Sequence, residues 1–137
     1  MLFIYNLSIF TGISILICAS GLSNSVMAAD FTINSAQTTK NGGNTLDGSD
    51  MITVTTTGSI SITSGSGIET SGDYNTVLVN GSISTTGRNR HGIVNKDNNN
   101  ATTLTGSVTT SGAGSFGITN QGDNNISTLI GDISTTA

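Results

Sequence analysis

A repeated glycine-led phrase constrains the fold of this chain more than any other feature of its sequence. Four similar phrases begin at Gly58, Gly81, Gly106 and Gly131, at successive spacings of 23, 25 and 25 residues, and read GSISITSGSGI, GSISTTGRNRHGI, GSVTTSGAGSFGI and GDISTTA. Self-similarity at a fixed period of this length is typical of a solenoid, in which each repeat covers the apolar face of the next. The sequence therefore predicts stacked rungs of about 23–25 residues.

The residues within each repeat favour strands over helices. They are rich in Ser, Thr, Gly and Asn, which are poor helix formers, and they carry no long apolar stripe at the helical period. Short β-branched runs between Gly and Asn clusters are typical of strands. Apolar and polar residues alternate in these runs, so only one face of each strand is apolar. We expect an all-β chain that forms a parallel β-helix, with three short strands in each rung.

Three apolar columns repeat at the 25-residue offset. We expect the members of each column to stack on one another inside the rungs: Ile68, Ile93 and Ile118; Val79, Leu104 and Leu129; and Ile83, Val108 and Ile133.

Asparagine forms a polar column at the same offset, at positions Asn75, Asn100 and Asn125. Asparagine tolerates the left-handed conformation of turns, bonds its own backbone, and can form a hydrogen-bonded ladder between stacked rungs. We interpret this column as a structural turn ladder rather than a ligand site.

The first 29 residues have the pattern of a secretory signal peptide. They contain no charged side chain, and residues 9–22 are mostly apolar. The apolar stretch is short for a membrane span, and Val26 and Ala28 occupy the positions that a signal peptidase reads. We expect a signal helix within residues 1–29, removed by cleavage after Ala28 or Ala29. The stretch before it lacks Lys and Arg, which a start codon further upstream would explain.

Composition limits the functions open to the remaining chain. It has no Cys, Pro or Trp, and the net charge of the protein is −4. An exported domain without disulfides must be stabilised by the stacking of its rungs. The sparse, net negative charge argues against nucleic acid as a partner.

Two segments carry a resemblance to a known family. The sequence ADFTI at residues 29–33 is followed by NTLDGSDMITVTTTGSI at residues 44–60 and then by the Gly-Ser-Ile-Ser repeats. With a signal peptide before them, these resemble the N-terminal end of an autotransporter passenger, from the type V secretion proteins of Gram-negative bacteria. The resemblance implies a right-handed β-helix that is exported by the Sec machinery and then through a C-terminal outer-membrane β-barrel.

The same resemblance implies a location and a role. The passenger would be displayed at the cell surface or outer membrane, or released outside the cell, and would adhere to a host surface, to glycans or to neighbouring cells. The sequence contains no alternating strands of the kind that build such a barrel. We therefore expect an N-terminal part of a longer protein: a signal peptide at 1–29, a cap region at 30–57 through which the chain joins the β-helix, and truncated repeats at 58–137.

One basic patch is the candidate ligand site. His91 is the only histidine, and it lies in an expanded turn beside Arg88 and Arg90, with Lys96 following closely. A contact with an anionic glycan is one hypothesis for this patch, and a solvated loop is the simpler interpretation. The sequence shows no G-x-S-x-G motif and no grouped Ser, His and Asp. We therefore expect no enzyme activity and no cofactor or metal.

Two alternatives stay open. Asp73 and Asp123 lie two rungs apart, roughly 9.6 Å, which is near the upper range for an inverting pair of carboxylates and keeps open a secreted polysaccharide-active enzyme. Outward rows of hydroxyls keep open an ice-binding β-helix, and these rows are Ser84, Thr109 and Ser134, and Thr86, Ser111 and Thr136.

Overall fold

The computed structural model describes residues 6–9, 13–16 and 27–137. Near the N-terminus, β1 (Asn6–Ile9) and β2 (Ile13–Leu16) pair antiparallel. The helix expected within residues 1–29 falls mainly outside the described residues. In the part that the structure describes, no helix is long and apolar enough to cross a membrane.

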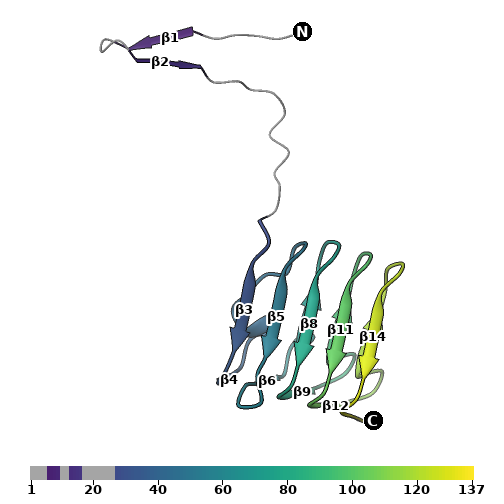
Figure 1. The fold of residues 1–137 in the computed structure, drawn as a ribbon. Helices are drawn as coiled ribbons and strands as arrows, with labels where there is room; N and C mark the ends of the chain where they lie inside the picture. Colours follow the sequence, from purple (N-terminus) through teal and green to yellow (C-terminus); the bar gives the residue numbers. More distant parts are fainter. Residues whose placement is uncertain (1–5, 10–12, 17–26) are drawn as a thin grey trace.

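Three parallel sheets make up the rest of the described chain (Figure 1). The first sheet contains β3 (Asp30–Ile33), β5 (Met51–Val54), β8 (Thr76–Val79), β11 (Ala101–Leu104) and β14 (Ile126–Leu129). The second sheet contains β4 (Ala36–Gln37), β6 (Ser59–Ile62), β9 (Ser82–Thr86), β12 (Ser107–Ser111) and β15 (Asp132–Thr136). The third sheet contains β7 (Ile68–Thr70), β10 (Ile93–Asn95) and β13 (Ile118–Asn120).

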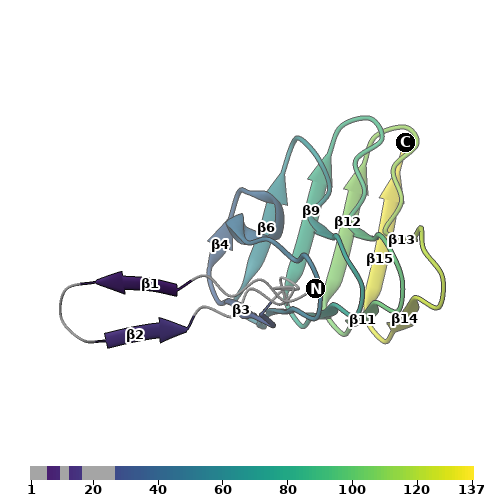
Figure 2. The same cartoon turned by 90° about the horizontal axis from the view of Figure 1, so that it is seen from above.

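Successive rungs lie side by side and pass through the sheets in the same order; the first rung has η1 (Lys40–Gly43) in place of a strand of the third sheet, and the last ends at β15. Figures 1 and 2 together show that the chain coils in a right-handed sense as it advances from β3 to β15. Right-handed crossovers are the rule between parallel strands. The prediction of an all-β, right-handed parallel β-helix is therefore confirmed.

The apolar columns lie in register within the sheets. Ile93 is paired with Ile68 on one side and Ile118 on the other, and Leu104 is paired in the same way with Val79 and Leu129. Ile68, Ile93 and Leu104 are fully buried, whereas Leu129 in the last rung is 53% exposed. Burial within each column thus depends on a rung on both sides.

The glycines that open the repeats mark a close approach between neighbouring rungs. A Cβ atom added at Gly106 would lie 1.9 Å from the carbonyl oxygen of Gly81, and one added at Gly81 would lie 2.1 Å from that of Gly58. Any side chain at these positions would force the rungs apart. The glycine spacing is therefore set by backbone contact between rungs.

A short 3₁₀ segment closes the N-terminal edge of the third sheet, which the repeat alone did not predict. In η1 (Lys40–Gly43), the backbone N–H of Asn41 donates to the Gly67 carbonyl, as the strands of this sheet do. The Asn41 side chain also accepts a hydrogen bond from the Glu69 N–H and donates one to the Glu69 carbonyl. Asn41 thereby satisfies the edge of β7 that would otherwise be free.

Candidate ligand-binding surface

The side chains of the asparagine column make hydrogen bonds within their own turn and to the turn before it. The Oδ1 atoms of Asn75, Asn100 and Asn125 each accept the backbone N–H of the matching residue one rung earlier, at distances of 3.1, 2.7 and 2.7 Å. Their Nδ2 groups donate to backbone carbonyls, as Asn75 does to Gly72 at 3.0 Å. Because both ends of each amide are used in this way, the column holds the turns together and offers no free group to a ligand.

The carboxylate column likewise serves the backbone. Asp73 accepts the Asn98 N–H through Oδ1, and Asn98 accepts the Asp123 N–H through its own Oδ1. Asn98 separates the two acids, so they do not form a facing pair. Within the described ranges, no group of three His, Cys, Asp or Glu side chains is arranged to hold a metal ion.

The structure divides the predicted basic patch into two parts. The Lys96 ammonium lies 3.0 Å from Glu69 Oε1, which also binds the Lys40 ammonium at 3.0 Å. Burial raises the pKa of Glu69, but the hydrogen bonds and charges of the two lysines outweigh burial and leave this pKa below its ordinary value. β10 separates Lys96 from His91, so Lys96 belongs to this ion-pair cluster and does not join the arginines.

Arg88, Arg90 and His91 do lie together, in the turn between β9 and β10. The turn is fixed by its counterpart one rung later, since the Arg90 N–H donates to Ser115 Oγ at 3.0 Å and Ser115 Oγ donates to the Gly87 carbonyl. Arg88 is exposed and Arg90 is half-buried. Both ion pairs found among the described residues involve Glu69, so neither guanidinium is paired there.

An aromatic pair stands beside these arginines. The His91 and Phe116 rings are stacked, with centroids 5.4 Å apart and planes inclined by 14°. His91 Nδ1 accepts the Phe116 N–H at 3.1 Å, which ties the two rings to neighbouring rungs. Phe116 is 58% exposed. Phe116 lies one rung after the turn that carries Arg88 and Arg90, so an apolar ring and two guanidinium groups occur on neighbouring turns. Such a ring can stack on a sugar face, and a guanidinium group can bind an anionic substituent.

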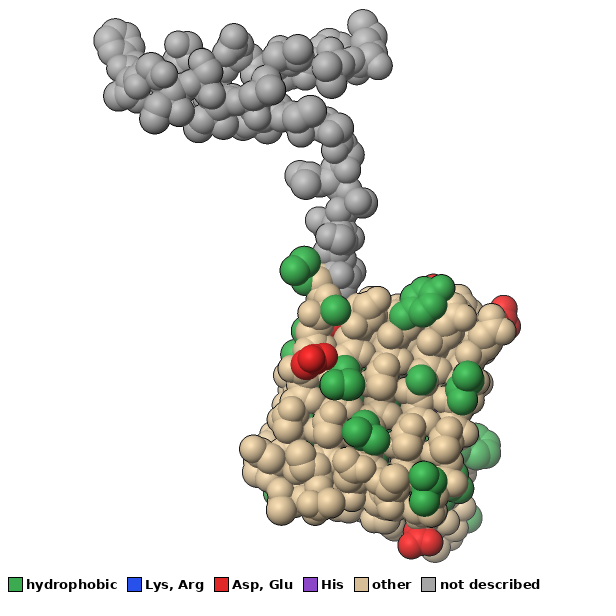
Figure 3. Space-filling view, in the orientation of Figure 1, with side chains coloured by type: hydrophobic (Ala, Val, Ile, Leu, Met, Phe, Trp, Pro, Cys, Tyr) green, Lys and Arg blue, Asp and Glu red, His purple; other side chains and the backbone are tan. Residues whose placement is uncertain are grey.

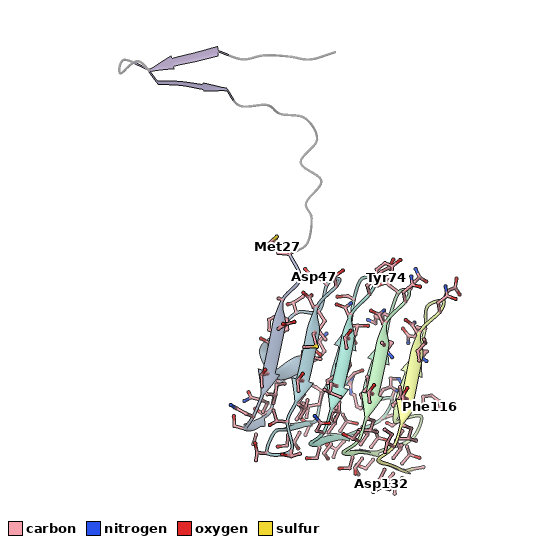
Figure 4. All side chains as sticks on the ribbon, in the orientation of Figure 1. Met27, Asp47, Tyr74, Phe116 and Asp132 are labelled. Carbon is pink, nitrogen blue, oxygen red and sulfur yellow. The ribbon has the colours of Figure 1, made fainter. Side chains whose placement is uncertain are left out.

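Sequence reasoning identified Arg88, Arg90 and His91 but assigned no role to Phe116. The signal was present, because Phe116 follows His91 by the 25-residue offset of the rungs. Tyr74 was also missed. It is 63% exposed and has a left-handed φ of 64° in a turn where the later rungs place Asn99 and Asn124. Figure 4 places Tyr74 and Phe116 at different edges of the rungs, so they form separate surfaces.

The outer faces of the first and second sheets are polar and nearly uncharged, whereas the third sheet carries the Glu69 ion pairs. Figure 3 shows this for the first sheet, where isolated hydrophobic side chains lie among uncharged polar atoms. On the second sheet, Thr109 is paired in register with Ser84 and Ser134, which aligns their hydroxyl-bearing positions across three rungs. Against this background, the turn at Arg88 to His91 is chemically distinct.

Comparisons of the chain with family models, with curated proteins and with solved structures return no match. Any role for the turn at Arg88 to His91 must therefore be argued from the contacts and exposure of its residues.

Proposed function

We propose that this chain is an exported β-helix of the autotransporter-passenger type, displayed at the surface of a Gram-negative cell as a non-catalytic binding module. The resemblance of residues 29–60 to that family and the right-handed parallel β-helix support this proposal. A passenger of this kind would use the Sec machinery and a barrel supplied by the same protein. Its partner would be an acidic glycan on a host or neighbouring cell.

The observation that carries the binding role is the stack of half-buried His91 on exposed Phe116, in a turn that also carries two arginines without ion pairs. The rings are fixed to two consecutive rungs by backbone hydrogen bonds. Such a preorganised surface loses little conformational entropy on binding. Catalysis is not part of the proposal, because Asp73 accepts the Asn98 N–H and Asn98, which separates Asp73 from Asp123, accepts the Asp123 N–H.

Calorimetric titration with a sulfated oligosaccharide and with its neutral counterpart tests this role. We expect binding of the sulfated form, and we expect Phe116→Ala to weaken it about tenfold. Arg88→Gln should weaken it and reduce its dependence on salt. Lys40→Gln is the matched control, since it removes one positive charge away from the turn. Equal loss in Arg88→Gln and Lys40→Gln, or equal binding of the neutral sugar, would contradict the proposed surface.

The aligned hydroxyls of the second sheet favour one second candidate, a protein that binds an ice surface. The register that pairs Ser84, Thr109 and Ser134 places one hydroxyl-bearing residue per rung in a single row. Thermal hysteresis of the purified protein tests this candidate, and its absence at high protein concentration would exclude it.

A further inference from the structure

Asp50 breaks the pattern of the asparagine column, and its surroundings explain the difference. It stands one rung before Asn75 in the same column and is 2% exposed. Its Oδ1 accepts the Ala29 N–H at 2.8 Å, and its Oδ2 accepts the Asp47 N–H at 2.8 Å. In the described part of the chain all ion pairs involve Glu69, so only neutral donors face this buried carboxylate.

Ala29 is the point at which the chain joins the β-helix. Its carbonyl accepts the Met51 N–H at 2.8 Å, and its N–H is held by Asp50. The two residues before it are exposed, and Met27, which Figure 4 labels above the first sheet, is 81% exposed. The peptide bond between Ala28 and Ala29 therefore separates exposed chain from chain held by the sheet.

We propose that the Ala28–Ala29 peptide bond is a processing site and that the new amino terminus of Ala29 is bound by the Asp50 carboxylate. This inference rests on the export that the proposed function includes. A signal-peptidase-type endopeptidase would add one water across the bond. Ala28 then ends the released peptide as a carboxylate, and Ala29 begins the retained chain as an ammonium, with no net gain or loss of protons.

The ammonium would stand where the Ala29 N–H now stands, 2.8 Å from Asp50 Oδ1. A cation in direct contact stabilises the ionised form of a buried carboxylate, which would otherwise be an unpaired buried charge. In the following rungs the matching donor is an internal peptide N–H, for which a neutral asparagine oxygen is sufficient. The first rung also differs at the second side-chain atom, because Asp50 Oδ2 accepts the Asp47 and Gly48 N–H groups where Asn75 Nδ2 donates to carbonyls. An acidic side chain is therefore required there, and an ammonium at Oδ1 would give it a charged partner in the first rung alone.

Cleavage one bond later would remove this arrangement. A chain beginning at Asp30 would lose both hydrogen bonds made by Ala29, and Asp50 Oδ1 would lose its partner. The sequence allows cleavage after either Ala28 or Ala29, and the hydrogen bonds of Ala29 favour cleavage after Ala28.

The first test is the mass of the protein recovered after expression of the full chain in a Gram-negative host. We expect an N-terminus at Ala29. An N-terminus at Asp30 would overturn the inference and leave export standing. Retention of Met1 would overturn both the inference and the export on which the proposed function depends.

The second test compares thermal unfolding of the processed chain with that of the unprocessed chain made by cell-free synthesis without membranes. Asp50→Asn should lower the Tm of the processed form by at least about 4 °C more than that of the unprocessed form. Asn75→Asp is the matched control, because it places a carboxylate in the same column without a nearby ammonium and should lower both Tm values equally. An equal effect of Asp50→Asn on the two forms would overturn the proposed pair.

Discussion

Truncation of Ile93 tests whether stability comes from stacking between rungs. Ile93 is fully buried and is paired with Ile68 and Ile118 in the rungs on either side. Ile93→Ala removes three carbon atoms, which at about 0.8 kcal/mol each is roughly 2.4 kcal/mol of transfer free energy. The cavity between two rungs raises the expected loss of unfolding free energy to about 3–4 kcal/mol. Ile93→Val should cost only about 1 kcal/mol.

Ile118 is the matched control, since it has the same side chain in the same column but lies on the last strand of the third sheet and is only partly buried. Ile118→Ala should cost about half as much as Ile93→Ala, because a cavity open to water is less costly. Urea unfolding followed by circular dichroism gives both values. Equal costs in a protein shown to be monomeric by sedimentation would refute the stacking argument.

Three further outcomes are expected. Gly106→Ala should lower the unfolding free energy by about 3 kcal/mol, because the added Cβ would meet the Gly81 carbonyl. Gly65→Ala has open space around it and should cost only about 1 kcal/mol, for the left-handed φ of this residue. Chemical denaturation of both variants gives the two values. Because folding lowers the pKa of Glu69, this residue stabilises the folded state above its unfolded pKa, and the stabilisation is lost as pH falls through the folded pKa. The Tm advantage of the wild type over Glu69→Gln should therefore shrink between about pH 5 and pH 3. A constant difference in Tm across this range, in parallel melts, would show that this is wrong. A purified chain of residues 1–137 should self-associate through the exposed apolar side chains of β14, which would appear as concentration-dependent sedimentation, and a monomer at all concentrations would contradict this.

The repeat predicted the parts of the fold that obey a constant offset. Parallel in-register stacking places residue i directly beside residue i + 25, so the pairing of Ile68, Ile93 and Ile118 could be derived by counting. The same counting could not predict Asn41, because the first rung has no earlier repeat and its cap follows local geometry. The role of Asp50 was hidden for the same reason, since its partner lies before the repeats begin.

The candidate surface shows a second limit of sequence reasoning. Lys96 is close to His91 in the chain, but the strand between them directs it to Glu69. Conversely, Phe116 is distant from His91 in the chain and in contact with it in space. In a solenoid, residues one repeat apart are neighbours in space. Residues that are close in the sequence can therefore lie in separate clusters, whereas residues 25 positions apart can share one.

Two side-chain ladders in the same turn point in opposite directions along the axis. The Oδ1 atom of Asn100 reaches back to the N–H of Asn75, whereas the Oδ1 atom of Asp73 reaches forward to the N–H of Asn98. Each turn is therefore hydrogen-bonded to the turns of both neighbouring rungs, so a rung cannot separate without breaking hydrogen bonds to its neighbours. In a linear array of repeats, strong coupling between neighbours of this kind makes the whole rod unfold as one cooperative unit, with fraying confined to its ends.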